Sequence, residues 1–252
     1  MSTDGRTLLQ PAYVLHRKPY RDTSLLLEAF SPEYGRIGLV ARGARSRRST
    51  LQALLQPFQP LLLSWSGRGE LHTLTAAEAD GTATKPHGDA LINGFYVNEL
   101  LMRLLPRDDP HPGLYASYRQ ALSRLSQGDD HEWSLRLFER DLLQELGYGL
   151  QLTHEGGSAH PLQPERHYCY HAEYGPQAAL DESPDCLAVS GATLLALATG
   201  EPAGESCRRE AKRLMRVILG HYLGPRPLAS RALFQARHAY SKRTEPTVDD
   251  EE

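Results

Sequence analysis

Five short runs of strand-forming residues lie close together near the start of the chain, with no long helix between them. The run Arg36–Arg42 shows the pattern most plainly, because Ile37, Leu39 and Ala41 alternate to one face of an extended chain. Strands so short and so closely spaced are typical of a small closed or half-closed barrel. The predicted strands cover residues 12–18, 24–30, 36–42, 58–65 and 70–77, and a short helix could lie over 49–56.

The periodicity changes after Lys85 and Pro86, where apolar residues begin to recur at helical spacing. Helices joined by short loops predict a bundle, although no periodicity lasts through 150–189. We therefore predict an α+β protein with a barrel over 1–84, a helical domain over 85–240 with an irregular insertion, and a disordered tail over 241–252. Residues 1–10 are expected to fray. The predicted helices cover 91–104, 114–125, 133–146, 190–198, 205–223 and 227–240.

A basic segment leaves the third predicted strand. It holds five arginines and no acidic residue, and after Gly43 it is too polar to bury. Such a segment predicts a mobile basic loop that can follow a chain of phosphates. The alternative is a solvated loop that serves only solubility, but that role needs fewer arginines. The five arginines are Arg36, Arg42, Arg45, Arg47 and Arg48.

The net charge of −3 hides an uneven distribution. Residues 1–60 hold nine Lys and Arg against four Asp and Glu, and residues 205–243 hold ten against two. In the helix expected over 205–223, basic residues cover the face opposite an apolar stripe, with only Glu210 among them. Like charges one turn apart cost stability, which favours an anionic partner over a merely solvated face.

Cysteines and metal-binding side chains are few. Three widely spaced cysteines favour a reducing compartment and argue against disulfides. Cys169 lies between His167 and His171, but zinc sites usually have two close ligand pairs and no second pair exists near Cys186 or Cys207. We therefore expect no metal and no cofactor. We also expect a cytoplasmic protein, since no apolar run approaches the ~20 residues of a membrane helix and no signal peptide is visible.

Motifs of nucleotide-binding loops, zinc hydrolases and serine hydrolases are absent from the sequence. We therefore expect no catalytic activity. Two rival functions stay open beside nucleic-acid binding. One is a protein–protein adaptor whose barrel binds no DNA, because a barrel of this kind can also bind proteins. The other is a DNA-processing enzyme.

Many stretches of the sequence resemble the recombination mediator RecO family, and together they cover nearly the whole chain. The longest is Gly35–Ser46, GRIGLVARGARS. The resemblance implies an N-terminal OB-fold, a helical domain with an irregular insertion, and no enzymatic chemistry. Many members carry a four-cysteine zinc site in the insertion, and this sequence departs from that pattern. Further matching stretches are Tyr13–His16, Ser24–Leu27, Leu55–Phe58, Gly67–Leu71, Tyr96–Leu101, Phe138–Gly149, Ala211–Arg213 and Leu228–Phe234.

The resemblance also implies partners and a place at the nucleoid. Members bind single- and double-stranded DNA, anneal complementary strands, and with RecR help to load RecA onto DNA coated by single-strand-binding protein (SSB). A basic barrel rim that binds phosphates without reading sequence suits annealing. The predicted DNA-binding residues are Arg17, Lys18, Arg21, Arg36, Arg42, Arg45, Arg47 and Arg48, together with Arg208, Arg209, Lys212, Arg213 and Arg216.

Many members contact the acidic C-terminal tail of SSB. Arg136 and Arg140, one helical turn apart, are candidates for its carboxylates. The basic face at 208–216 is another candidate. Ion pairs within the acidic middle of the chain are an alternative for both arginines, since residues 61–204 hold twenty Asp and Glu against nine Lys and Arg. Tyr20 and Tyr34 could stack on bases, but packing within their loops is the preferred interpretation.

Overall fold

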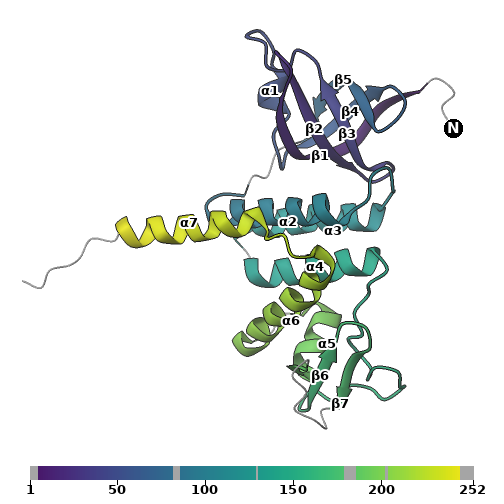
Figure 1. Ribbon diagram of the computed structural model, residues 1–252, viewed down its shortest axis with the longest axis vertical. Helices are drawn as coiled ribbons and strands as arrows, with labels where there is room; N and C mark the ends of the chain where they lie inside the picture. Colours follow the sequence, from purple (N-terminus) through teal and green to yellow (C-terminus); the bar gives the residue numbers. More distant parts are fainter. Residues whose placement is uncertain (1–4, 82–85, 129, 179–185, 202–203, 245–252) are drawn as a thin grey trace, which may run out of the picture.

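The computed structural model describes residues 5–81, 86–128, 130–178, 186–201 and 204–244. An N-terminal barrel stands on a layer of helices, and a small sheet lies at the far end of the helical domain (Figure 1). The predicted α+β class, a five-stranded barrel followed by a helical domain, is confirmed. Among the described residues, no helix is both long and apolar enough to cross a membrane.

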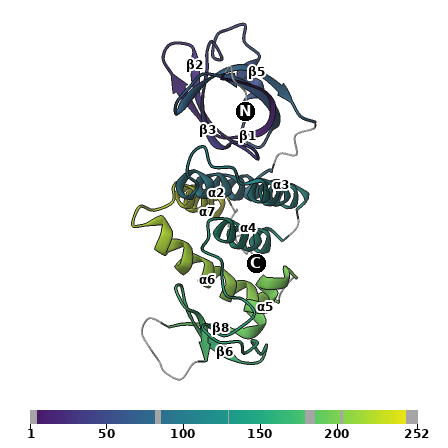
Figure 2. The same cartoon turned by 90° about the vertical axis from the view of Figure 1, so that its right-hand side faces the viewer.

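The barrel is closed by five strands in the order β1-β2-β3-β5-β4, and Figure 2 looks into it from one end. A parallel pairing of β3 with β5 completes the closure. Alternate apolar side chains such as Leu27, Leu39 and Leu63 fill the interior. The first strand begins at Arg6, so the expectation of fraying is wrong for residues 6–10. The elements are β1 (Arg6–Tyr20), β2 (Ser24–Ser31), β3 (Gly35–Ala41), α1 (Leu51–Leu54), β4 (Pro60–Ser66) and β5 (Leu71–Ala79).

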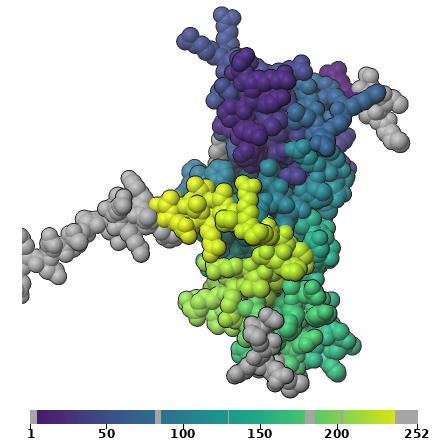
Figure 3. All heavy atoms as spheres, in the orientation of Figure 1, coloured from purple at the N-terminus to yellow at the C-terminus, as the bar shows by residue number. Residues whose placement is uncertain are grey.

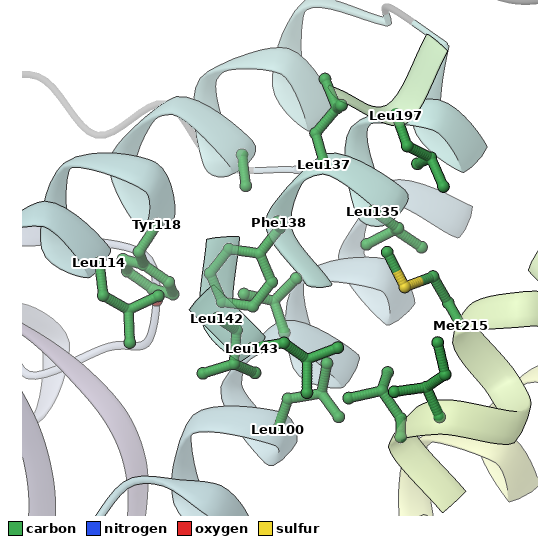
Figure 4. Close-up of a cluster of buried hydrophobic side chains, with 14 of the residues drawn as sticks. Leu100, Leu114, Tyr118, Leu135, Leu137, Phe138, Leu142, Leu143, Leu197 and Met215 are labelled. Atoms are coloured by element: carbon green, nitrogen blue, oxygen red, sulfur yellow. The ribbon is translucent and has the colours of Figure 1, made fainter. Parts of the chain in front are cut away.

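The helical domain packs its long helices around one apolar core (Figure 4). Phe138 and Leu142 lie at its centre, between Tyr118 and Leu100 from neighbouring helices. The side chain of Asp130 caps the fourth helix by accepting a hydrogen bond from the amide of Trp133, at 3.1 Å. The helices are α2 (Asp89–Leu104), α3 (Pro112–Gln127), α4 (His131–Glu145), α5 (Gly191–Thr199), α6 (Glu205–Leu223) and α7 (Ala229–Thr244).

The last helix corrects the predicted disordered tail. Because α7 runs to Thr244, residues 241–244 are helical, while 245–252 lie outside the described residues. Glu99 on α2 fixes the start of α7, since its carboxylate accepts hydrogen bonds from the amides of Ala229 and Ser230 at 2.7 and 2.9 Å.

Aromatic side chains join the barrel to the helices. Tyr13 and Phe30 leave the barrel wall and pack against Tyr118 and Tyr115, with ring centroids 5.2 and 5.5 Å apart. Asn98 on α2 donates to the Leu15 carbonyl of β1 at 2.9 Å. The orientation of the barrel is therefore fixed by buried contacts.

A three-stranded sheet occupies the segment for which the sequence shows no periodicity. Its strands, in the order β7-β6-β8, have only four or five residues each, too few to show an alternating pattern. The pairing of Cys169 with Ala188 brings Cys186 close, and Cys169 and Cys186 form a disulfide with Cα atoms 5.1 Å apart. The expectation of unpaired cysteines is wrong for these two. The strands are β6 (His167–His171), β7 (Gly175–Ala178) and β8 (Leu187–Ser190).

Candidate nucleic-acid interface

Two segments meet at the end of the barrel that faces away from the helices, and we call residues 17–23 and 42–50 the barrel tip (Figure 1). The antiparallel register of β1, β2 and β3 places the β1–β2 turn beside the exit from β3. The amide of Arg45 donates to the carbonyl of Thr23 at 2.8 Å and ties the two segments together. The fold therefore collects basic residues that are more than twenty positions apart in sequence.

The segment after β3 is a succession of turns. Gly43 adopts a left-handed φ of 67°, which a residue with a side chain rarely does, and it starts the first turn. The amide of Ser46 donates to the Gly43 carbonyl, and that of Ser49 donates to the Ser46 carbonyl, both at 3.0 Å. These backbone bonds hold the segment in place at the top of the barrel. The top of the barrel projects from the molecule in Figure 3.

The barrel tip holds seven basic residues and one acid, Asp22. Arg17 is half-buried, and its guanidinium donates to the carbonyl of Gln52 at 2.9 Å, so it fixes α1 rather than facing solvent. Arg21 lies 5.2 Å from the ring centre of Tyr20 and covers it. Among the described residues, none of the seven forms an ion pair. Arg17 is occupied by its backbone contact, which leaves six cations for a partner: Lys18, Arg21, Arg42, Arg45, Arg47 and Arg48.

Arg36 lies at the opposite end of β3, where the barrel meets the helices. Its guanidinium donates to the Met102 carbonyl at 2.7 Å and lies 3.9 Å from Glu28, which also pairs with Arg107. Burial lowers the pKa of Arg36, and the Glu28 carboxylate opposes this effect. The structure thus separates Arg36 from the barrel tip and gives it a role in joining the domains. Tyr34 also lies away from the tip, packed edge-on against Trp65.

The basic face of α6 is largely neutralised by acidic residues. Arg208 pairs with Asp130, and Lys212 pairs with Glu132 at 2.6 Å, both acids from the start of α4. Arg209 pairs with Glu205 on its own helix, and Arg213 donates to the Ala188 carbonyl of β8. Arg216 is exposed and forms no ion pair within the described part of the chain.

These acidic partners could not be found by sequence reasoning. Asp130 and Glu132 are about 80 positions before the arginines that they neutralise, and no local spacing relates the two groups. Only the packing of α4 against α6 brings them together. The second acid of the helix, Glu210, turns away and accepts hydrogen bonds from Ser190 and Thr193 at 2.7 Å.

Arg136 and Arg140 are both engaged within the helical domain. Arg136 is 7% exposed and pairs with the fully buried Glu139, which also accepts a hydrogen bond from Tyr96 at 2.6 Å. Burial raises the pKa of Glu139, and the charge of Arg136 opposes this effect. Arg140 pairs with Asp141 and donates to the Leu197 carbonyl at the end of α5. This arrangement matches the alternative of ion pairs within the acidic middle.

The residues of β6 do not fit a four-cysteine zinc site. Cys169 is bonded to Cys186, its sulfur lies 3.2 Å from Nε2 of His171, and Cys207 lies on α6. In the part of the chain that the structure describes, no three His, Cys, Asp or Glu side chains are grouped to hold a metal ion. The expected absence of zinc stays a prediction.

Comparison with known proteins covers both domains. The family model described as Recombination protein O N terminal matches residues 6–82, and the one described as Recombination protein O C terminal matches residues 86–232. DNA repair protein RecO of Nitrosococcus oceani is 51% identical over 91% of this chain and 94% of its own length. The RecO proteins of Methylococcus capsulatus and Alkalilimnicola ehrlichii are both 52% identical, over 92% and 93% of this chain and 95% and 93% of their own lengths.

These matches confirm the resemblance found in the sequence, over both domains. The closed barrel with a basic tip is what the N-terminal match covers, and the helices and the small sheet fall within the C-terminal match. The chain belongs to the RecO family of DNA repair and recombination proteins.

Proposed function

We propose that this protein binds single- and double-stranded DNA through the barrel tip, anneals complementary strands, and with RecR helps to load RecA onto SSB-coated DNA. The observation that carries the DNA contact is the cluster of unpaired cations at the barrel tip, accompanied by a single acid. Flexible basic side chains bind backbone phosphates without reading base sequence. That property suits annealing, in which any pair of complementary strands must be accepted.

The proposal requires no catalytic group and places the protein with the chromosome. RecR, RecA and the SSB tail are proposed partners on the strength of the family alone. The SSB tail would need cationic side chains that are free to turn toward it. Arg216 and the exposed arginines of the barrel tip meet that requirement better than Arg136, whose guanidinium would first have to leave Glu139.

The test is a salt titration of affinity for a fluorescent single-stranded oligonucleotide. Changing Arg45, Arg47 and Arg48 together to Gln should flatten the slope of log K against log salt by about 2, since each phosphate contact contributes ~0.7 on single strands. Affinity should fall by about ten- to a hundredfold on all sequences alike. The matched control carries the same charge change on α6, Arg208, Arg209 and Lys212 to Gln, and should stay near the wild-type slope.

Each rival function predicts a different result in the same assay. An adaptor without DNA binding would show no salt-sensitive affinity in the wild-type protein. A DNA-processing enzyme would change the length of the oligonucleotide when Mg²⁺ is added. A wild-type slope in the barrel-tip variant would refute the proposed interface.

A further inference from the structure

A concave site lies at the end of β3 opposite the barrel tip, near the junction with the helices. It is a pocket of about 480 Å³, within the ~300–1,000 Å³ common for ligand sites. Trp65 and Tyr34 form its aromatic part, and Glu70 and Asp108 supply two carboxylates. The proposed function uses none of these four side chains.

The aromatic part of the pocket is held rigidly. Trp65 is 3% exposed, and Tyr34 packs edge-on against it with ring centroids 5.0 Å apart and ring planes at 85°. Ile37, buried in the barrel wall, also lines the pocket. Tyr34 remains 37% exposed, so a ligand can reach the aromatic surface without moving the barrel. A fixed aromatic ring that remains accessible, as that of Tyr34 does, attracts cations as well as apolar groups.

The two carboxylates come from different domains. Glu70 precedes β5 in the barrel, whereas Asp108 belongs to the α2–α3 connection, where its amide donates to the Arg36 carbonyl at 3.0 Å. Within the described residues, neither carboxylate forms an ion pair or a side-chain hydrogen bond. The nearby Arg36 and Arg107 are both directed to Glu28. Arg36 senses the charge of Asp108 but forms no ion pair with it, and His72 also lines the pocket. Two carboxylates that no described cation pairs with therefore remain open to a ligand.

Aromatic rings beside two open carboxylates match a planar cation on an apolar stem. A guanidinium can lie against the exposed Tyr34 ring and donate to a carboxylate beside it, and an ammonium does this less well. A nucleotide would bring phosphate close to Glu70 and Asp108 and be repelled. We propose that this pocket receives an arginine side chain of a partner protein. Because β3 separates the pocket from the barrel tip, the partner can bind while the tip remains open.

The test uses the indole N–H signals of the full-length protein in a two-dimensional ¹H–¹⁵N NMR spectrum. The chain has two tryptophans, and Trp133 serves as an internal reference because its indole donates to the Gly200 carbonyl inside the helical domain. Titration with N-acetyl-arginine methylamide should shift the Trp65 signal saturably, with a dissociation constant of about millimolar size for so small a ligand. The Trp133 signal should not move.

N-acetyl-citrulline methylamide is the matched probe, since it keeps the shape of arginine without the charge. It should bind about tenfold more weakly or worse. Glu70→Gln combined with Asp108→Asn should weaken arginine binding to a similar extent, and Glu78→Gln, on β5 but outside the pocket, should leave it unchanged. Asn accepts the left-handed φ of 57° at position 108.

Three results would overturn the proposal. The first is a Trp65 signal that arginine does not move, and the second is equal binding of arginine and citrulline by the wild-type protein. The third is tighter binding of thymidine monophosphate than of arginine, which would make the pocket a nucleotide site. Because the citrulline comparison uses only the wild-type protein, it decides the matter even if the double variant is unstable. The salt dependence of DNA affinity, which tests the proposed DNA interface, does not depend on any of these three results.

Discussion

The barrel tip and the face of α6 have similar basic sequences but different surroundings. At the tip, exposed arginines stand beside one acid, Asp22. On α6, Arg208 and Lys212 are paired with acids of α4. A run of basic residues therefore predicts an interface for anions only when the fold keeps acidic residues away from it, and that depends on packing rather than on local composition.

The position of each surface explains the difference. The barrel tip faces away from the helical domain, whereas α6 packs directly on α4 (Figure 1). Most acidic residues of the stretch 61–204 lie in that helical domain, and two of them, Asp130 and Glu132, reach α6. Four changes test this comparison, and we take them from the largest expected effect to the smallest.

The strongest pairing is that of Arg136 with Glu139, both almost fully buried. Arg136→Ala should lower the free energy of unfolding by about 3–5 kcal/mol, because it leaves a buried carboxylate without its counter-charge. Urea denaturation measures this loss. Arg140→Ala, which removes a more exposed pair, should cost about 1 kcal/mol or less. A stable Arg136→Ala protein that fails to bind an SSB-tail peptide would instead favour the tail-binding role.

Glu210 tests why the acid that stands among the basic residues of α6 does not pair with them, although Glu205 at the helix start pairs with Arg209. Burial opposes its ionisation, but hydrogen bonds from Ser190 and Thr193 outweigh burial and lower its pKa. Its contribution to stability is thus complete above the ordinary Glu pKa of about 4.3 and is lost as the pH falls through the lower, folded-state pKa. Glu210→Gln should lower the free energy of unfolding by about 1–2 kcal/mol at pH 7 and by less at pH 3. Equal losses at both pH values would contradict this.

Sequence reasoning located the barrel, the long helices and the basic segment because each depends on contacts between near neighbours. Ile37, Leu39 and Ala41 alternate as expected of β3, and the apolar spacing of α4 marks its buried side. Sequence reasoning failed where the contacting residues are distant from each other along the chain. The neutralisation of α6, the short strands of the small sheet and the position of Arg36 at the domain junction all depend on tertiary packing.

Arg36 and Arg42 form a matched pair, since they lie at opposite ends of one strand and differ only in surroundings. Arg36→Gln should lower the free energy of unfolding by about 1 kcal/mol through the lost contacts with Met102 and Glu28, with little change in the salt slope for DNA. Arg42→Gln should leave the free energy of unfolding unchanged and flatten the slope of log K against log salt for single-stranded DNA by about 0.7. The opposite outcome would place the DNA contact at the domain junction.

The smallest expected effect tests the neutralisation of α6 directly. Asp130→Asn with Glu132→Gln removes two negative charges and releases Arg208 and Lys212. Asn is as good a cap for α4 as Asp, so the helix should keep its start, and loss of two partly exposed ion pairs should cost little stability. The released cations can then contact phosphates, and DNA affinity at low salt should rise by about two- to fivefold with a steeper salt slope.

Combining this change with the Arg45, Arg47 and Arg48 replacements separates the two surfaces, because any gain in DNA affinity must then come from α6. If affinity does not rise in either background, pairing with acids is not what keeps α6 from DNA, and its position below the barrel would have to be the reason.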